Sequence, residues 1–262
     1  MIRLISGVLL AAVALAAIWF LPLIGLRILA CAVAALAAHE YLALVHPDRR
    51  HAQPVPIVLL VILTCWWISD PARRGLLPLL LVGLGWMAIE ATFRGLAIDR
   101  AAARFIALWY IGMPLGMLVV VQSAGGRLAT LLLLATVVVS DSAQYYSGRM
   151  LGRRPLAPAI SPKKTVEGAI GGLAGAAIFM LLAGPLVFPN ASRVSLAVLG
   201  LVISILGITG DLFESRMKRI ADVKDSGALI PGHGGALDRI DALLFAIPAF
   251  YMYLAIYSVF QL

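Results

Sequence analysis

Acidic side chains are concentrated in the second half of this 262-residue chain. Eight of its thirteen aspartates and glutamates lie at or beyond Asp141, and most stand near lysine, arginine or glycine. Carboxylates bind hard divalent cations, whereas lysine, arginine and glycine-rich backbone bind phosphate oxygens. This combination is typical of Mg²⁺-assisted phosphate chemistry. Three segments of the chain carry it.

The first segment is VVVSDSAQYYSGRMLG, in which Asp141 follows an apolar run. A carboxylate within or just below a membrane interface is costly, and it is usually functional or paired. Tyr145 and Gly148 follow at helical spacing and share its face. An ion pair between Asp141 and either Arg149 or Arg153 is the simpler alternative.

The second segment is LAPAISPKKTVEGAIGGLAG. Ser161 followed by Pro162 predicts a helix N-cap and the first helical position. A helix that begins there directs free backbone N–H groups, Lys163 and Lys164 at one place, as phosphate binding requires. The alternative is positive charge that only ends a membrane span. Close helix packing explains the four glycines of residues 168–175 without a ligand.

The third segment is GDLFESRMKRIADVKDSGALIPGHGGALDRID. Four of its residues share one helical face if the preceding apolar helix continues into the cytosol. These are Asp211, Ser215, Lys218 and Arg219. Asp238 and Asp241, three residues apart, share a face where the last apolar run begins. The segment therefore supplies acids and bases from two helix ends.

A glycine-rich stretch separates these two helix ends. Glycine lets the backbone approach a ligand closely, and consecutive N–H groups can form an anion-binding nest. His233 within it either donates to a phosphate oxygen or transfers a proton, or it only caps a turn. A second histidine group, His39, His46 and His51, lies near Glu40 and Asp48, and we interpret it as ordinary interfacial residues.

The ligand types indicate which metal is expected. Several carboxylates, one loop histidine and no nearby cysteine favour Mg²⁺ over Zn²⁺, with Mn²⁺ as an alternative. A second ion, divalent or monovalent, is compatible with such a site.

Composition indicates where this chemistry takes place. The chain is 62% hydrophobic and only 13% charged, with a mean hydropathy of +0.98. Its apolar runs have roughly the length that crosses a bilayer as helix, about 20 residues. Their leucine and alanine content favours helices. The sequence therefore predicts an all-α, polytopic integral membrane helical bundle.

About nine transmembrane helices are predicted. They lie near residues 5–20, 22–44, 55–69, 75–92, 104–122, 128–147, 166–188, 194–213 and 240–260. A cytosolic N-terminus places sixteen of the 21 lysines and arginines in cytosolic segments, as the positive-inside rule requires. The most charged loops, residues 148–165 and 213–239, then face the cytosol.

This topology predicts N-terminal transmembrane helices over residues 1–127 and a transmembrane catalytic region over 128–262. Topology and anionic lipid explain the net charge of +8, so no nucleic-acid partner is expected.

A longer pattern is present in the third segment. In order stand Ser215-Arg-Met-Lys218-Arg219, Lys224-Asp225, Pro231-Gly-His233-Gly234-Gly235 and Asp238-Arg239-Ile-Asp241. This order and spacing, over 27 residues, resembles the signature of the CDP-diacylglycerol synthases, also called phosphatidate cytidylyltransferases. The region from Asp141 to Gly172 resembles the second diagnostic region of that family. The resemblance is specific for the C-terminal half of the chain.

The resemblance implies a nucleotidyltransferase that transfers CMP from CTP to phosphatidate, giving CDP-diacylglycerol and pyrophosphate with Mg²⁺. It implies phospholipid biosynthesis at the inner membrane, with the active site facing the cytosol. CTP, phosphatidate and membrane lipids are the expected partners, and a homodimer is left open.

The following roles for individual residues are hypotheses. The expected catalytic residues are Asp211, Asp238, Lys218, Lys224 and His233. The expected substrate-binding residues are Ser161, Lys163, Lys164, Ser215, Arg219, Gly234, Gly235 and Arg239. The expected metal ligands are Asp141, Asp211, Asp225, Asp238 and Asp241.

Two other classes of protein stay open. A transporter or channel would use Asp141 as an ion site, but it predicts charge near the bilayer midplane and internal repeats. Another membrane transferase, either a CTP-dependent lipid kinase or a prenyltransferase, would need the same metal and phosphate ligands. A prenyltransferase also predicts paired diphosphate motifs, which this sequence lacks.

Overall fold

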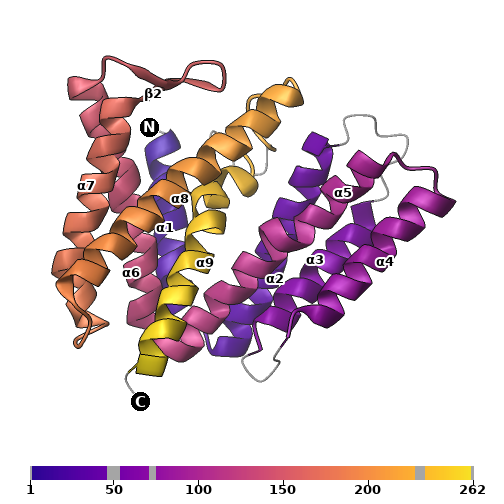
Figure 1. Cartoon of the computed structure of the whole chain (residues 1–262), viewed down its shortest axis with the longest axis horizontal. Helices are drawn as coiled ribbons and strands as arrows, with labels where there is room; N and C mark the ends of the chain where they lie inside the picture. Colours follow the sequence, from indigo (N-terminus) through magenta and orange to yellow (C-terminus); the bar gives the residue numbers. More distant parts are fainter. Residues whose placement is uncertain (1, 46–53, 71–74, 228–233, 261–262) are drawn as a thin grey trace. The chain divides into compact units, whose positions relative to one another are not determined.

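The computed structural model describes residues 2–45, 54–70, 75–227 and 234–260 (Figure 1). Within these ranges the chain is almost entirely helical, because its long apolar runs satisfy their backbone polar groups internally as helices. The principal helices are α1 (Ile2–Phe20), α2 (Leu23–Val45), α3 (Pro54–Ile68), α4 (Leu77–Phe93), α5 (Ile98–Ala107), α6 (Met113–Leu151), α7 (Val166–Ala183), α8 (Arg193–Ile220) and α9 (Leu237–Phe260).

Several of these helices are suited to a membrane. In the described part of the chain, five helical segments are long and apolar enough to cross one. They are Leu23–Val45, Ile98–Leu151, Val166–Leu186, Arg193–Ile220 and Leu237–Val259. Shorter apolar helices cover Ala11–Phe20, Pro54–Ile68 and Leu77–Phe93. The all-α membrane class is confirmed, whereas nine spans and a cytosolic N-terminus stay predictions.

The longest helical segment is interrupted. A π-helical turn η2, Leu108–Gly112, connects α5 to α6, and α6 contains a non-helical residue at Gly126 with φ 78° and ψ 178°. Only glycine adopts such a backbone conformation readily. The break lies between residues 104–122 and 128–147, where the sequence predicts two separate spans.

The chain forms two compact units. Unit 1 comprises Met1–Ser123 with Ile220–Arg239, and unit 2 comprises Ala124–Arg219 with Ile240–Leu262. The first boundary lies close to residue 128, the predicted start of the catalytic region. The segment Ile220–Arg239, which the sequence assigns to that region, groups instead with the N-terminal helices.

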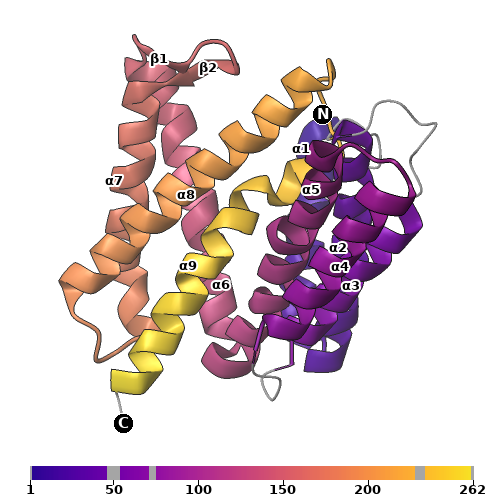
Figure 2. The same ribbon diagram turned by 45° about the vertical axis from the view of Figure 1, so that its right-hand side comes forward.

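In unit 1 helix α2 packs on α3, and α2, α3 and α4 all contact α5, as Figure 2 shows. Ala34, Ala37 and Ala38 are completely buried, so small side chains let α2 approach its neighbours closely. A buried ion pair joins α4 to α5, with the Arg104 guanidinium 2.6 Å from the Glu90 carboxylate.

In unit 2 helix α7 packs closely against the second half of α6. A Cβ atom on Gly175 would stand 2.7 Å from Ala143 Cβ, and one on Gly171 would overlap the Ser147 side chain. The prediction that these glycines serve helix packing is confirmed. The Ser140 and Ser204 hydroxyl groups, 2.7 Å apart, connect α6 to α8.

Replacing Gly200 by alanine is expected to destabilise the protein. A Cβ atom there would lie 2.5 Å from the Ala176 carbonyl oxygen, and backbone cannot move aside as a flexible side chain can. Overpacking of this kind costs about 1 to 3 kcal/mol. Gly85→Ala is the matched control, because no atom lies within 4 Å of its Cβ position.

Thermal unfolding in detergent measures the difference between these two variants. Gly85→Ala should be neutral or stabilising by up to about 1 kcal/mol, the helix-propensity difference. Equal unfolding temperatures for the two variants would contradict the close contact between α7 and α8.

A small hairpin connects α6 to α7 in unit 2. Strands β1 (Pro155–Ala157) and β2 (Ser161–Thr165) pair antiparallel, with Pro155 opposite Thr165 and Ala157 opposite Ser161. The expectation that a helix begins at Ser161 is therefore wrong. An extended Ser161 before proline is compatible with either a helix N-cap or a strand, and the pairing with residues 155–157 makes it a strand.

The helix after this hairpin begins at Val166, four residues after the start that Ser161 and Pro162 predict and at the start of the predicted span 166–188. The Thr165 Oγ1 atom accepts a hydrogen bond from the Gly168 N–H at 3.1 Å, which makes Thr165 the N-cap of α7.

Candidate active site

Three aspartates from three helices of unit 2 form what we call the carboxylate cluster: Asp141 on α6, Asp211 on α8 and Asp241 on α9. Lys164 of the hairpin makes an ion pair with Asp211. Asp211 interacts electrostatically with both other aspartates, and Lys164 also interacts with Asp141. Three carboxyl groups are thus held together beside a lysine, an arrangement that suits the binding of a cation.

Strand geometry separates the two lysines of the hairpin. Successive side chains of a strand point to opposite faces. Lys164 is half-buried against Asp211, whereas Lys163 is exposed. The two lysines therefore do not point at one place, as a helix start at Ser161 would have required.

Hydrogen bonds hold the hairpin on its neighbours in unit 2. The Glu167 carboxylate accepts from the backbone N–H groups of Arg153, at 3.0 Å, and Arg154, at 3.2 Å. The Arg219 guanidinium of α8 donates to the Ile160 carbonyl oxygen at 3.4 Å. These contacts fix the strand that carries Lys164.

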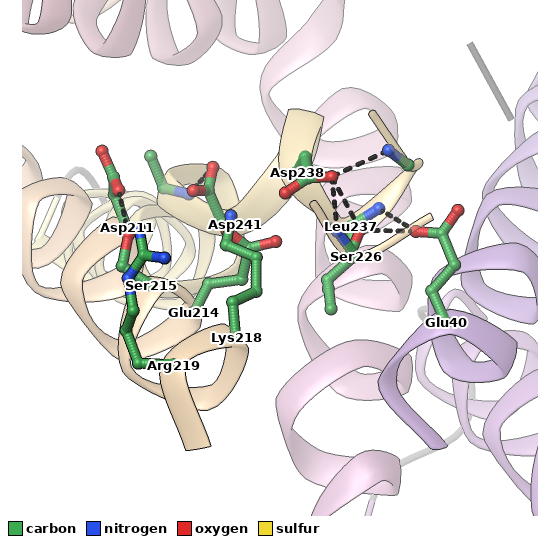
Figure 3. A network of polar contacts seen from close by, with 12 residues as sticks. Glu40, Asp211, Glu214, Ser215, Lys218, Arg219, Ser226, Leu237, Asp238 and Asp241 are labelled. Carbon is green, nitrogen blue, oxygen red and sulfur yellow. Dashed lines mark hydrogen bonds and ion pairs between the residues drawn. The ribbon is translucent and has the colours of Figure 1, made fainter. Parts of the chain in front are cut away.

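The end of α8 extends beyond the apolar run, as predicted. Ser215 donates to the Asp211 carboxylate at 3.3 Å, one helical turn away (Figure 3). The Lys218 ammonium lies 2.5 Å from the carboxylate of Glu214, which is completely buried. Lys218 also interacts electrostatically with Asp241, so it connects Glu214 to the carboxylate cluster.

The simpler alternative for Asp141 is not observed. The Arg149 side chain donates to the Tyr145 hydroxyl at 3.5 Å, and among the described residues neither Arg149 nor Arg153 pairs with Asp141. Asp141 is exposed on α6, with Lys164 as the positive charge that acts on it.

A second polar group lies in unit 1, around Asp238. Its Oδ2 atom accepts from the Ser226 N–H and hydroxyl, each at 2.9 Å, and from the Gly235 N–H at 2.8 Å. Gly234 has φ 77°, a left-handed conformation that favours glycine. Asp238 thus holds the two sides of the glycine-rich segment together (Figure 3).

Glu40 of α2, which the sequence analysis grouped with ordinary interfacial residues, belongs instead to the polar group around Asp238. It is buried, with 8% of its surface exposed, and its carboxylate accepts hydrogen bonds from Ser226, Ala236 and Leu237. One signal was available, since Glu40 is the only acidic residue in the 23 residues of this apolar helix. A carboxylate at such a position is usually functional or paired.

The predicted site residues fall into two sets. Unit 2 holds Ser161, Lys163, Lys164, Ser215, Lys218, Arg219 and the carboxylate cluster, whereas unit 1 holds Lys224, Asp225, Gly234, Gly235, Asp238 and Arg239. Lys224 and Asp225 are exposed. His233 lies outside the described residues. A joint site of Asp238 with Asp211 stays a prediction.

The donor types fit a hard cation. Among the described residues, no three histidine, cysteine, aspartate or glutamate side chains meet closely enough to hold a metal ion by themselves. The cluster nevertheless offers three carboxylates from three helices, and Mg²⁺ commonly takes only one or two carboxylates with water and phosphate oxygens. Magnesium therefore fits the chemistry of these residues and is a proposal below.

The described helices define an all-α membrane protein, and unit 2 of this protein carries a carboxylate–lysine cluster. The model of a family described as "Cytidylyltransferase family" matches residues 1–257. The chain belongs to this family.

Curated relatives agree with this assignment. A phosphatidate cytidylyltransferase of Thermotoga maritima is 32% identical over 231 residues, 86% of this chain and 85% of the relative. One of Bacillus subtilis is 42% identical over 166 residues, 61% of this chain and 60% of the relative. The uncharacterized protein YnbB of Escherichia coli K12 is 47% identical over 149 residues, 56% of this chain and 48% of the relative. The chain thus spans only about half of several relatives that it matches.

Proposed function

We propose that the protein transfers CMP from CTP to phosphatidate, giving CDP-diacylglycerol and pyrophosphate. Membership of a cytidylyltransferase family and relatives named phosphatidate cytidylyltransferase support this proposal. The observation that carries it is the ion pair of Lys164 with Asp211 inside the carboxylate cluster. Family membership also makes a transporter or a prenyltransferase a weaker interpretation.

In the proposed reaction a phosphate oxygen of phosphatidate attacks the α-phosphorus of CTP. The bond from that phosphorus to the bridging oxygen breaks, and pyrophosphate leaves with the electron pair. Both reactants are anionic, so the reaction needs neutralised charge more than a strong base. Lys164 and Lys218 offer positive charge beside the carboxylate cluster for this purpose.

Magnesium belongs to the proposal as well, with Mn²⁺ as an alternative. Asp141, Asp211 and Asp241 would hold it by ligand type, with Asp225 and Asp238 as candidates from unit 1. When bound, such a cation neutralises phosphate charge and orients the reacting groups. The ion pair with Lys164 orients the Asp211 carboxylate in the protein without a bound cation.

The location we propose is the cytosolic face of the inner membrane. CTP is a soluble polyanion and phosphatidate has its anionic head at the interface, so the two meet only at that surface. The distribution of lysine and arginine supports a cytosolic location for residues 148–165 and 213–239. The carboxylate cluster borders both loops in the sequence.

A labelling experiment tests the proposed function. Purified protein in detergent receives Mg²⁺, phosphatidate and CTP labelled at either the α- or the γ-phosphate. We expect the α-label in the lipid phase and the γ-label in pyrophosphate. A CTP-dependent lipid kinase would instead move the γ-label into lipid. No lipid label from folded protein, with an active relative as control, would refute the proposal.

A further inference from the structure

Glu40 holds the start of helix α9 inside unit 1. Its Oε1 atom accepts from the Ala236 N–H at 2.9 Å, and its Oε2 atom accepts from the Leu237 N–H at 2.8 Å. The first N–H groups of a helix have no partner within the helix and carry partial positive charge. The buried Glu40 carboxylate accepts hydrogen bonds from these N–H groups and balances their partial positive charge. Glu40 lies 196 positions from Ala236 in the sequence.

The glycines beside α9 are explained by the same carboxylate. A Cβ atom on Gly227 would stand 2.6 Å from Glu40 Oε1, and one on Gly235 would overlap Oε2. At these two positions glycine allows the chain to close around Glu40. The anion held by this part of the glycine-rich segment is therefore one that the protein itself supplies.

Ser226 couples Glu40 to Asp238. Its hydroxyl oxygen lies 3.0 Å from Glu40 Oε2 and 2.9 Å from Asp238 Oδ2. A hydroxyl group has a single proton, so it donates to one of the two carboxylates at a time. Displacement of Glu40 would thus disturb the contacts of Asp238. Figure 3 shows the Glu40 carboxylate directed at Ser226 and Leu237, and the Asp238 carboxylate directed at Ser226.

We propose that Glu40 is a positioning residue for the transfer reaction: it fixes the start of α9 and, through Ser226, the Asp238 carboxylate. The catalytic part of this proposal rests on the proposed function. The carboxylate form is required because each oxygen faces a donor. A glutamine would turn its NH₂ group against a backbone N–H, and an aspartate is one methylene group too short.

The decisive variant is Glu40→Gln, studied in the full-length protein. We expect kcat to fall between about 10- and 100-fold, as for other residues that orient a reactive group. KM for CTP should change less than about threefold, because positioning acts on the chemical step. Hydrogen exchange of the Ser226, Gly235, Ala236 and Leu237 amides should become faster. Ser226→Ala, which removes one shared donor, should show the same changes to a smaller extent.

Glu90→Gln is the matched control, because it removes another buried carboxylate of unit 1. Glu90 pairs with Arg104 of α5 and with Arg94, both away from the glycine-rich segment in the sequence. It should lower the unfolding temperature but leave kcat and the exchange of those four amides unchanged. Equal effects of Glu90→Gln and Glu40→Gln on kcat would overturn the proposal.

The remaining outcomes separate the two proposals. Faster exchange in Glu40→Gln with normal kcat would reduce Glu40 to a structural role and overturn its positioning role. If these amides in Glu40→Gln exchange as slowly as in the wild type, Glu40 does not fix the start of α9, whatever the activity. If Glu40→Gln does not fold, unchanged exchange and kcat in Ser226→Ala overturn the proposal instead. If the wild type transfers no CMP, the proposed function is refuted. Hydrogen exchange then still tests whether Glu40 fixes the start of α9.

Discussion

Lys164→Ala is expected to lower kcat/KM by about 100- to 1000-fold, the usual effect of removing one group that stabilises developing charge. Lys164 is half-buried and paired with Asp211, so it acts where charge is concentrated and water is partly excluded. The adjacent Lys163→Ala should change kcat/KM by less than about fivefold, because an exposed charge contributes little. Initial rates with labelled CTP and phosphatidate measure both.

The two lysine variants form a matched pair. They remove the same side chain from neighbouring positions, and they differ only in the face of strand β2 that they occupy. Both proteins should unfold within a few degrees of the wild type in detergent, since a partly exposed ion pair contributes about 1 kcal/mol or less. Similar rate losses in the two variants would contradict the orientation of β2.

Asp211→Asn is expected to have the largest effect on activity, at least about 1000-fold in kcat/KM, as for groups that act as part of a catalytic unit. Asparagine neither balances Lys164 nor provides an anionic ligand for a hard cation. Stability should change little, because the lost ion pair is offset by reduced repulsion with Asp141 and Asp241. Initial rates and thermal unfolding of one preparation measure both quantities.

Glu214→Gln, one turn further along α8, should lower the free energy of unfolding markedly, unlike Asp211→Asn. Glu214 is completely buried and paired with Lys218. Breaking a buried pair costs about 3 to 5 kcal/mol, and here it leaves Lys218 without its hydrogen-bonded carboxylate. A marked loss of stability in Asp211→Asn, or none in Glu214→Gln, would contradict these assignments.

The positions of the helices could be predicted well from the sequence. Helix α3 begins at Pro54 and α8 at Arg193, each one residue from the predicted start of the span. The reason is local, because an apolar run of membrane length forms a helix and proline or charge ends it. The same local reasoning correctly extended α8 beyond the apolar run, through Asp211 and Ser215 to Arg219.

The hairpin could not be predicted in the same way. Ser161 and Pro162 are compatible with a helix start, and only pairing with residues 155–157 makes this segment a strand. That pairing also decides which lysine meets Asp211. Lys163 and Lys164 are the same residue type at adjacent positions. They have different surroundings because successive side chains of a strand point to opposite faces.

The sequence by itself determined the class of protein, the family and the kinds of side chain available, because hydropathy and motif spacing are properties of neighbouring residues. Only the tertiary structure decided that Lys164 pairs with Asp211, 47 residues away, and that Glu40 pairs with Ser226, 186 residues away. A buried carboxylate takes whichever donors packing brings within about 3 Å. Packing brings together segments that are distant in the chain, so the partners follow from the fold.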